Sequence, residues 1–187
     1  MTRPTQLLIF SALAVTAGSL AVEFESRAVA QTSPLLASNP TRRPAPSWKN
    51  ESWLNSDMPL TLEGLKGKVV LLNFWAVNCP PCRIEMPELQ KIYRRYTGRG
   101  LRVIGVTEMD PVRDQARRFI EESGVTYPIL LDPGARIADL YALEAHPTTV
   151  VIDARGRVRF VNAGYLKGEE KEIERAVLQA LGAGGGR

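Results

Sequence analysis

Two cysteines separated by two prolines stand at a junction between a strand and a helix, and this junction restricts what the chain can fold into. Residues 69–74, Val-Val-Leu-Leu-Asn-Phe, are almost continuously apolar, which is typical of a strand buried on both faces. After Cys82, apolar side chains recur at i, i+3, i+4 and i+7, the spacing of a helix with one buried face. These side chains are Leu89, Ile92, Tyr93 and Tyr96. The sequence therefore predicts a strand–Cys-Pro-Pro-Cys–helix unit.

Strands and helices continue to alternate along the rest of the chain. Asp110 and Asp132 each precede a proline, which is typical of an N-cap followed by proline at the first helical position. Residues 153–156, Asp-Ala-Arg-Gly, predict a hairpin turn. Further strands are predicted at 101–106, 128–131, 148–152 and 158–161, with a last helix over 173–181. The order β-α-β-α-β-α-β-β-α predicts an α/β fold with a central mixed sheet and helices on both faces.

The two ends of the chain carry different signals. Within residues 1–30, Arg3, the apolar run 7–22 and Ala28-Val29-Ala30 together are typical of a signal peptide. The run is also close to the length of about 20 residues that spans a bilayer, so a single N-terminal membrane anchor is the alternative. Either way we expect export. The remaining chain divides into a proline-rich linker at 31–47, a folded domain at 48–182 and a flexible glycine-rich tail at 183–187.

Composition excludes several classes of protein. The 24 Lys and Arg residues are interleaved with 20 Asp and Glu, so nothing favours a nucleic-acid-binding protein. No apolar stretch is long enough for a multi-pass membrane protein. Two cysteines cannot build a multi-bridge scaffold or a four-thiolate zinc site. We expect a monomer without cofactor or bound metal.

The spacing of the two cysteines suits redox chemistry. Cys79 is predicted at the N-terminus of the helix, where unpaired N–H groups and the helix dipole stabilise a thiolate. Pro80 and Pro81 lack N–H groups and make the turn stiff. Cys82, one turn later, is expected to be more buried and to attack a mixed disulfide formed at Cys79. This is thiol–disulfide exchange. The alternative is a buried structural pair or half of a metal site.

The segment from Phe74 to Cys82, with Pro87 and Pro147-Thr148-Thr149, resembles the thioredoxin superfamily. Gly67 to Trp75 and the longer middle of the chain are similar to the TlpA/ResA branch of exported bacterial thiol–disulfide oxidoreductases. The resemblance implies a thioredoxin-like fold in which residues 108–131 form an extra helix and strand. It implies a periplasmic reductase, soluble or tethered to the inner membrane, that serves cytochrome c or cytochrome oxidase assembly. Its implied partners are disulfide-containing exported proteins and a membrane-embedded electron donor.

The same resemblance implies a cis peptide bond between His146 and Pro147, although an ordinary proline at the start of a strand also fits the sequence. Asn78 stands where relatives commonly carry Trp, which affects the identity of the partner. His146, the sole histidine, is a candidate for tuning Cys79, because an imidazolium favours a thiolate; the alternative is an exposed polar neighbour. The implied substrate groove comprises Trp75, Asn78, Pro80, Pro81, His146 and Pro147.

Proton supply to the second cysteine is a separate question. Asn73 occupies the position at which plain thioredoxins carry a buried Asp that moves protons for that cysteine, and an amide does not titrate. Some members of the TlpA/ResA branch supply a Glu from the insertion instead. Glu108 and Asp110 are therefore candidate catalytic residues. The alternative is that Glu108 is solvated and Asp110 only caps a helix.

Other functions compete with the reductase. A peroxidase of the peroxiredoxin type would carry Thr at the position of Ala76. A copper chaperone could use Cys79, Cys82 and His146 as ligands, but the short spacing and stiff prolines argue against it. A disulfide oxidant or isomerase is the closest alternative, because sequence does not set a reduction potential. The reductase is favoured because the chain lacks a large helical insertion of the kind that dedicated oxidants carry.

Overall fold

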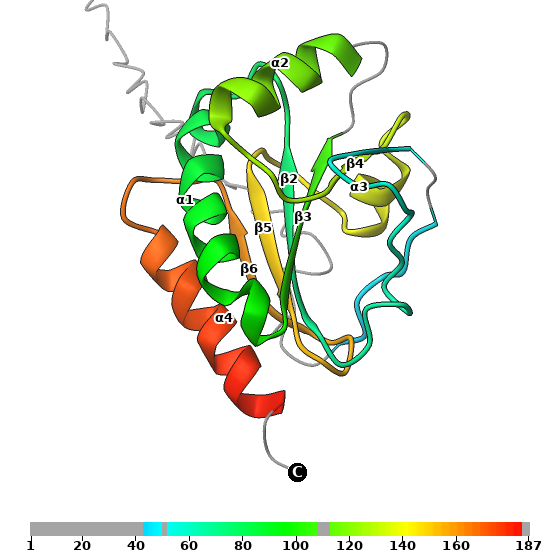
Figure 1. Ribbon diagram of the computed structural model, residues 1–187, viewed down its shortest axis with the longest axis vertical. Coiled ribbons are helices and arrows are strands. Elements are labelled where there is room, and N and C mark those ends of the chain that lie inside the picture. The colour runs from blue at the N-terminus through cyan, green and yellow to red at the C-terminus, as the bar shows by residue number, and fades with distance from the viewer. Residues whose placement is uncertain (1–42, 50–51, 108–112, 185–187) are drawn as a thin grey trace, which may run out of the picture. The chain divides into compact units, whose positions relative to one another are not determined.

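The computed structural model describes residues 43–49, 52–107 and 113–184 of the 187-residue chain (Figure 1). The predicted signal peptide or anchor, residues 1–30, lies outside these ranges. The elements, in chain order, are β1 (Trp53–Leu54), β2 (Val69–Trp75), α1 (Pro80–Tyr96), η1 (Thr97–Arg99), β3 (Leu101–Thr107), α2 (Arg113–Ser123), β4 (Ile129–Leu131), α3 (Arg136–Leu140), β5 (Thr148–Ile152), β6 (Val158–Ala163) and α4 (Glu170–Gly184). No helix in the described ranges has the length and apolar content needed to cross a bilayer.

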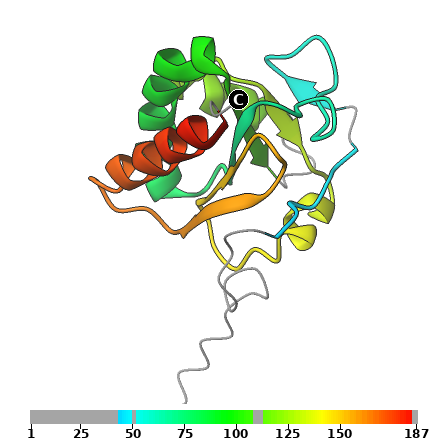
Figure 2. The ribbon, with the colours of Figure 1, turned by 90° about the horizontal axis from the view of Figure 1, so that it is seen from below.

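One six-stranded sheet has the strand order β1-β4-β3-β2-β5-β6. β2 lies inside it, parallel to β3 and antiparallel to β5. All of its residues are buried, as the apolar run over 69–74 predicts, because strands on both sides and helices above and below exclude water. The predicted mixed sheet with helices on both faces is confirmed (Figures 1 and 2).

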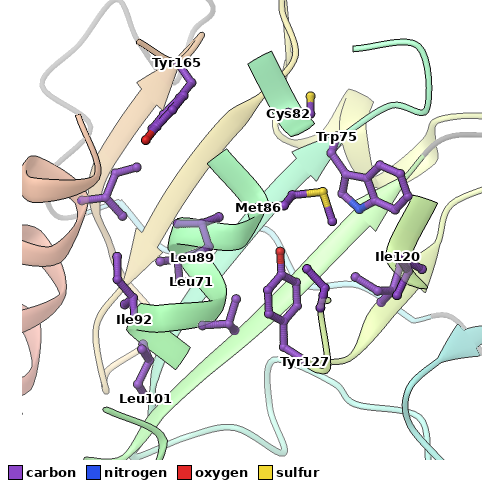
Figure 3. Close-up of a cluster of buried hydrophobic side chains, with 14 of the residues drawn as sticks. Leu71, Trp75, Cys82, Met86, Leu89, Ile92, Leu101, Ile120, Tyr127 and Tyr165 are labelled. Carbon is purple, nitrogen blue, oxygen red and sulfur yellow. The ribbon is translucent and has the colours of Figure 1, made fainter. Parts of the chain in front are cut away.

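Each face of the sheet carries its own hydrophobic core. α1, α2 and α4 cover one face, and side chains of α1 such as Met86 and Leu89 pack there against Leu71 and Trp75 of β2 (Figure 3). α3 and the segment that precedes β2 cover the other face. Figure 2 shows α1 (green) and α4 (red) on one side of the strands and α3 (yellow) on the other.

The segment before the predicted domain already pairs with the sheet at Pro44, inside the range 31–47 that the sequence predicts to be a linker. Pro44 forms an isolated antiparallel bridge with Arg157, and the backbone N–H of Ala45 donates to the carbonyl of Gly156 at 2.8 Å. The C-terminal part of the expected linker at 31–47 is therefore packed on the fold. Strand pairing satisfies its backbone there, so prolines without a donor are tolerated at this edge.

α3 begins at Arg136, three residues later than the predicted first helical position at Pro133. A turn intervenes, and Ala135 adopts a positive φ of 57° within it. The carboxylate of Asp132 still caps the helix, because its Oδ2 accepts from the backbone N–H groups of Ile137 at 2.8 Å and Ala138 at 3.0 Å. Ala135 is therefore the N-cap residue in place of the predicted Asp132, and Asp132 satisfies N–H groups of the first turn from three residues before the cap.

Candidate active site

Cys79 and Cys82 form a disulfide at the N-terminus of α1, with their Cα atoms 5.3 Å apart. Cys79 is the N-cap, in extended conformation, and Pro80 and Pro81 are the first two helical residues. Proline is well placed there because its fixed φ suits the first turn and its missing N–H would lack an intrahelical partner. The sequence of this turn therefore determines where the helix begins.

Because Pro80 and Pro81 lack backbone N–H groups, the N–H of Cys82 is the first one in the helix. This N–H lies 3.2 Å from Sγ of Cys79, to which it donates. A backbone donor at a helix N-terminus stabilises negative charge, so it would favour the thiolate of Cys79 in the reduced protein. Cys79 is 7% exposed and Cys82 is 0% exposed. Of the two cysteines, only Cys79 keeps any exposed surface.

Glu85 lies one turn beyond Cys82 on the buried face of α1, and its carboxylate is held by two strands. Nδ2 of Asn73 on β2 donates to Oε2 at 2.7 Å. Oγ1 of Thr149 on β5 donates to Oε1 at 2.8 Å and accepts from Asn73 at 3.2 Å. Asn73 and Thr149 are directly paired across the two strands. These two polar side chains thus form a hydrogen-bonding site for a carboxyl group inside the core.

Burial raises the pKa of Glu85 from 4.5 to about 7. The hydrogen bonds from Thr149 and Asn73 lower this pKa, and the nearby charge of Glu169 adds to the rise. Loss of water outweighs the donors because the side chain is fully buried. A carboxyl group with this pKa exchanges protons near neutral pH, which suits a general acid or base.

The sequence interpretation missed Glu85, although the signal was present. Cys82, Glu85, Met86 and Leu89 follow the i, i+3, i+4, i+7 spacing, so Glu85 falls on the buried face of the helix. A charged residue on such a face is rarely buried without partners. Asn73 was considered only as the loss of a titrating group, whereas in the structure it is a hydrogen-bond donor to one.

Glu108 and Asp110, the carboxylates that the resemblance indicated, lie outside the described residues. α2, which follows them, begins at Arg113. Their proximity to the disulfide therefore stays a prediction, and Glu85 is the buried carboxylate that the structure places near Cys82.

The peptide bond between His146 and Pro147 is cis, as the resemblance implies. The backbone N–H of Gly164, just after β6, donates to the carbonyl of Pro147 at 2.7 Å. Pro147 is buried, and His146 is half-buried. Among the other predicted groove residues, Asn78 and Pro80 are exposed and Pro81 is partly so.

Trp75 does not line a surface groove, so this part of the prediction is wrong. Its side chain is fully buried and stacks on Phe119 of α2, with ring centroids 4.8 Å apart. The guanidinium of Arg83 lies 4.4 Å from the centroid of the same Phe119 ring. Trp75 points toward α1 and α2 because alternate residues of β2 face opposite sides of the sheet. It belongs to the same hydrophobic cluster as Cys79 and Cys82, and Figure 3 shows it beside Cys82.

Metal binding finds no support in the geometry. Within the residues that the structure describes, no three His, Cys, Asp or Glu side chains lie close enough to hold a metal ion together. The sulfurs of Cys79 and Cys82 are bonded to each other.

The fold and the disulfide place this chain among thioredoxin-like proteins. A model of the AhpC/TSA family matches residues 41–161, and the chain belongs to that family. A solved structure of a thioredoxin-family thiol:disulfide interchange protein from Chlorobium tepidum superposes with a TM-score of 0.64. The two proteins are 27% identical in sequence, and the superposition covers 75% of this chain and 97% of the Chlorobium chain.

Two relatives narrow the comparison. The thiol-disulfide oxidoreductase ResA of Halalkalibacterium halodurans is 37% identical over 105 residues, which cover 56% of this chain and 59% of the relative. The thioredoxin-like protein YneN of Bacillus subtilis is 38% identical over 114 residues, 60% of this chain and 66% of the relative. The matched segment thus spans about three fifths of the ResA relative and two thirds of YneN, and the chain is a ResA-like member of the thioredoxin superfamily.

Proposed function

We propose that this protein is an extracytoplasmic thiol–disulfide oxidoreductase that reduces disulfides in exported partner proteins. The observation that carries the proposal is the arrangement at the N-terminus of α1. Cys79 is 7% exposed and its sulfur accepts a backbone N–H, while Cys82 is fully buried one turn from a carboxyl group with a pKa of about 7. The names of the relatives support the same class of reaction.

The first step forms a mixed disulfide. The thiolate of Cys79 attacks one sulfur of the partner's disulfide, the partner's S–S bond breaks, and the other partner sulfur leaves as a thiolate. The N–H of Cys82 stabilises the attacking thiolate through the 3.2 Å contact seen in the oxidised state. Cys79 performs this step because it is the more exposed of the two cysteines.

The second step releases the reduced partner. Cys82 loses its proton, and its thiolate attacks the sulfur of Cys79, which re-forms the Cys79–Cys82 bond and expels the second partner thiolate. Two electrons pass to the partner in total. We assign proton acceptance from Cys82 to Glu85, since i and i+3 side chains share a helix face and the Glu85 pKa lies near neutrality.

Partner contact would occur around the rim of this turn. Asn78 and Pro80 are exposed beside Cys79, and Ile84, on the next turn of α1, is 51% exposed. Leu166, 73% exposed, belongs to the loop whose Gly164 is hydrogen-bonded to Pro147. Arg83, on the same part of α1, forms an exposed ion pair with Glu122, so the rim combines apolar, uncharged polar and charged groups, as a surface for a polypeptide segment does.

The cellular setting is part of the proposal. The signal-like residues 1–30 support export, either with cleavage or as a membrane tether. Reducing equivalents would have to arrive from a membrane-embedded donor, because an oxidising compartment does not maintain dithiols by itself. A role in cytochrome c or cytochrome oxidase assembly rests on the resemblance to the TlpA/ResA branch alone.

The reduction potential of the Cys79–Cys82 couple tests the direction of the reaction. The oxidised protein would be equilibrated with a glutathione or dithiothreitol series and the free thiols counted by alkylation. A potential at or below about −220 mV, in the range of glutaredoxins and thioredoxin, supports a reductant. A potential near about −120 mV, that of a strong oxidant, would overturn it and favour the oxidant alternative.

A further inference from the structure

A cavity of about 550 Å³ lies at the end of the sheet opposite to the disulfide. It is enclosed by the turn before β2, the hairpin turn between β5 and β6 and the C-terminal end of α4. A hollow of about 300 Å³ beside it shares some of the same side chains. We call the two together the basic pocket; its charged side chains are Lys66, Asp153, Arg155, Arg157 and Arg159.

The basic pocket and the disulfide lie at opposite ends of β2. Lys66 and Gly67 precede the strand, and Cys79 follows it. At about 3.3 Å per residue, the seven residues of β2 separate the two sites by roughly 23 Å. In Figure 1 the turns that form the pocket lie at the bottom of the sheet, whereas the N-terminal end of α1 lies at the top. A ligand in the pocket would therefore leave the disulfide accessible.

Four cations surround one carboxylate here, and that carboxylate is already engaged. Oδ1 of Asp153 accepts from the backbone N–H groups of Arg155 at 2.9 Å and Arg157 at 3.0 Å. Its Oδ2 lies 3.6 Å from the guanidinium of Arg159. Within the described ranges, neither Lys66 nor Arg155 makes an ion pair with a carboxylate. The pocket thus has excess positive charge and several N–H donors.

The N-terminal segment enters the domain beside this pocket. Pro44 is bridged to Arg157, and the N–H of Ala45 donates to Gly156 of the same hairpin turn. In the sequence, about 20 residues separate Arg43 from the end of the apolar run 7–22. Pro44 and Ala45, among the first described residues of the chain, are therefore hydrogen-bonded beside the cationic pocket.

We propose that the basic pocket binds a phosphate-class anion. Guanidinium groups bind phosphate through paired N–H donors, and an ammonium group adds a compact charge. The volume exceeds that of a single phosphate and suits a diphosphate or the headgroup of an anionic phospholipid. The proposal does not depend on the proposed redox function, because none of its residues contacts the active-site turn.

Titration of the full chain with pyrophosphate at low ionic strength, followed by calorimetry, tests the anion site. The variant K66Q/R155Q/R159Q removes three charges from the pocket. The matched control R94Q/K171Q/R175Q removes three charges from exposed positions on α1 and α4. We expect saturable binding in the wild type and control, and an affinity at least about tenfold lower in the pocket variant, since each charge-assisted hydrogen bond strengthens binding.

A second arm distinguishes the source of the phosphate. Sedimentation with vesicles of phosphatidylglycerol and phosphatidylcholine, compared with phosphatidylcholine alone, measures the contribution of anionic headgroups. The N-terminal apolar segment contributes equally in wild type and variants, so the difference between the pocket and control variants reports the pocket. Loss confined to the phosphatidylglycerol vesicles assigns the site to lipid, and loss confined to pyrophosphate assigns it to a soluble anion.

Equal affinities of the pocket and control variants for both probes would overturn the proposal. The cations would then only offset the partial negative charge at the C-terminus of α4. In that case the pocket variant would be less stable in urea denaturation than the control but would bind anions unchanged. Circular dichroism of each variant confirms that the fold is intact before binding is compared.

Discussion

The side-chain amide of Asn73 donates a 2.7 Å hydrogen bond to the carboxylate of Glu85, inside the core and one helical turn from Cys82. The strand therefore contributes an uncharged donor, and the helix contributes the titrating group. An Asp at the position of Asn73 would bring two carboxylates together, and like charges at short distance raise one another's pKa. The amide instead stabilises the single carboxylate and holds its orientation. The predictions below follow from this pair and from the turn that it supports.

The two cysteines are expected to have different roles in exchange. Cys82→Ser should accumulate mixed disulfides with partner proteins, because the resolving thiol is missing, whereas Cys79→Ser should accumulate none. Non-reducing electrophoresis after acid quenching measures the trapped species. In the reduced wild type, alkylation at neutral pH should label Cys79 well before Cys82. Equal labelling of the two thiols would contradict the assignment.

Glu85→Gln should slow release of the reduced partner by about 100-fold, the size of effect typical of one general acid–base group. It should also abolish the inflection near pH 7 in the rate, because Gln does not titrate. The measurement is the reduction rate of a disulfide substrate from pH 5 to 9.

Three variants serve as controls for Glu85. Glu88→Gln removes a more exposed carboxylate from the same helix, where it pairs with Lys91, and should leave the profile unchanged. Glu108→Gln and Asp110→Asn test the candidates that the sequence indicated. A change of profile in either of them, with Glu85→Gln matching the wild type, would transfer the proton role to the insertion.

Thr149→Val should raise the pKa of Glu85 further, because the hydroxyl donates to its carboxylate and this hydrogen bond lowers the pKa. A hydrogen bond to a charged group contributes about 1.5–3 kcal/mol, so the inflection should move upward by about one pH unit or more. Thr148→Val is the matched control on the same strand, since Thr148 donates to the carbonyl of Ala145 instead. An equal shift in both variants would point to a general effect on β5.

The free energy of unfolding of the oxidised protein should decrease between about pH 4.5 and pH 7. In this window the folded state retains a proton on Glu85 that the unfolded state has lost, because the folded pKa is raised from 4.5 to about 7. The stabilising contribution is complete below pH 4.5 and is lost as the pH passes 7, with a magnitude of at most about 3 kcal/mol. Urea titrations of the wild type and Glu85→Gln measure it, and a parallel slope in the two proteins would contradict the shift.

Gly105→Ala should destabilise the domain by about 1–3 kcal/mol, the cost of overpacking a tight core. A Cβ at this position on β3 would lie 3.0 Å from Nε1 of Trp75 and 3.3 Å from Tyr127, and closer still to Ile129. Gly98→Ala is the control, because nothing lies within 4 Å of a Cβ there. The denaturation midpoints of the two variants are compared. Equal stabilities would show that the side chains around Gly105 can shift to accommodate a methyl group at little cost.

The local sequence determined the strands, the helices and the reactive turn. The apolar run over 69–74 is buried on both faces inside a sheet, and Pro80-Pro81 is best tolerated in the first turn of a helix, where the missing N–H groups cost no hydrogen bond. β1 was not predicted, because its two residues are too short for a periodic pattern and their strand conformation comes from pairing with β4. Pairing with a distant segment likewise placed Pro44 on the hairpin.

The environment of each side chain was decided by the tertiary structure. Trp75 was expected at the surface, but α2 returns to cover it with Phe119, 44 positions further along the chain. Glu85 falls on the buried face of the helix pattern, but its pKa near 7 arises only because the packing of α1 on β2 and β5 excludes water from the carboxylate that Asn73 and Thr149 hold. Local propensity depends on neighbours along the chain, whereas burial and pKa depend on neighbours in space. For this reason the sequence identified the two cysteines but not the carboxyl group beside them.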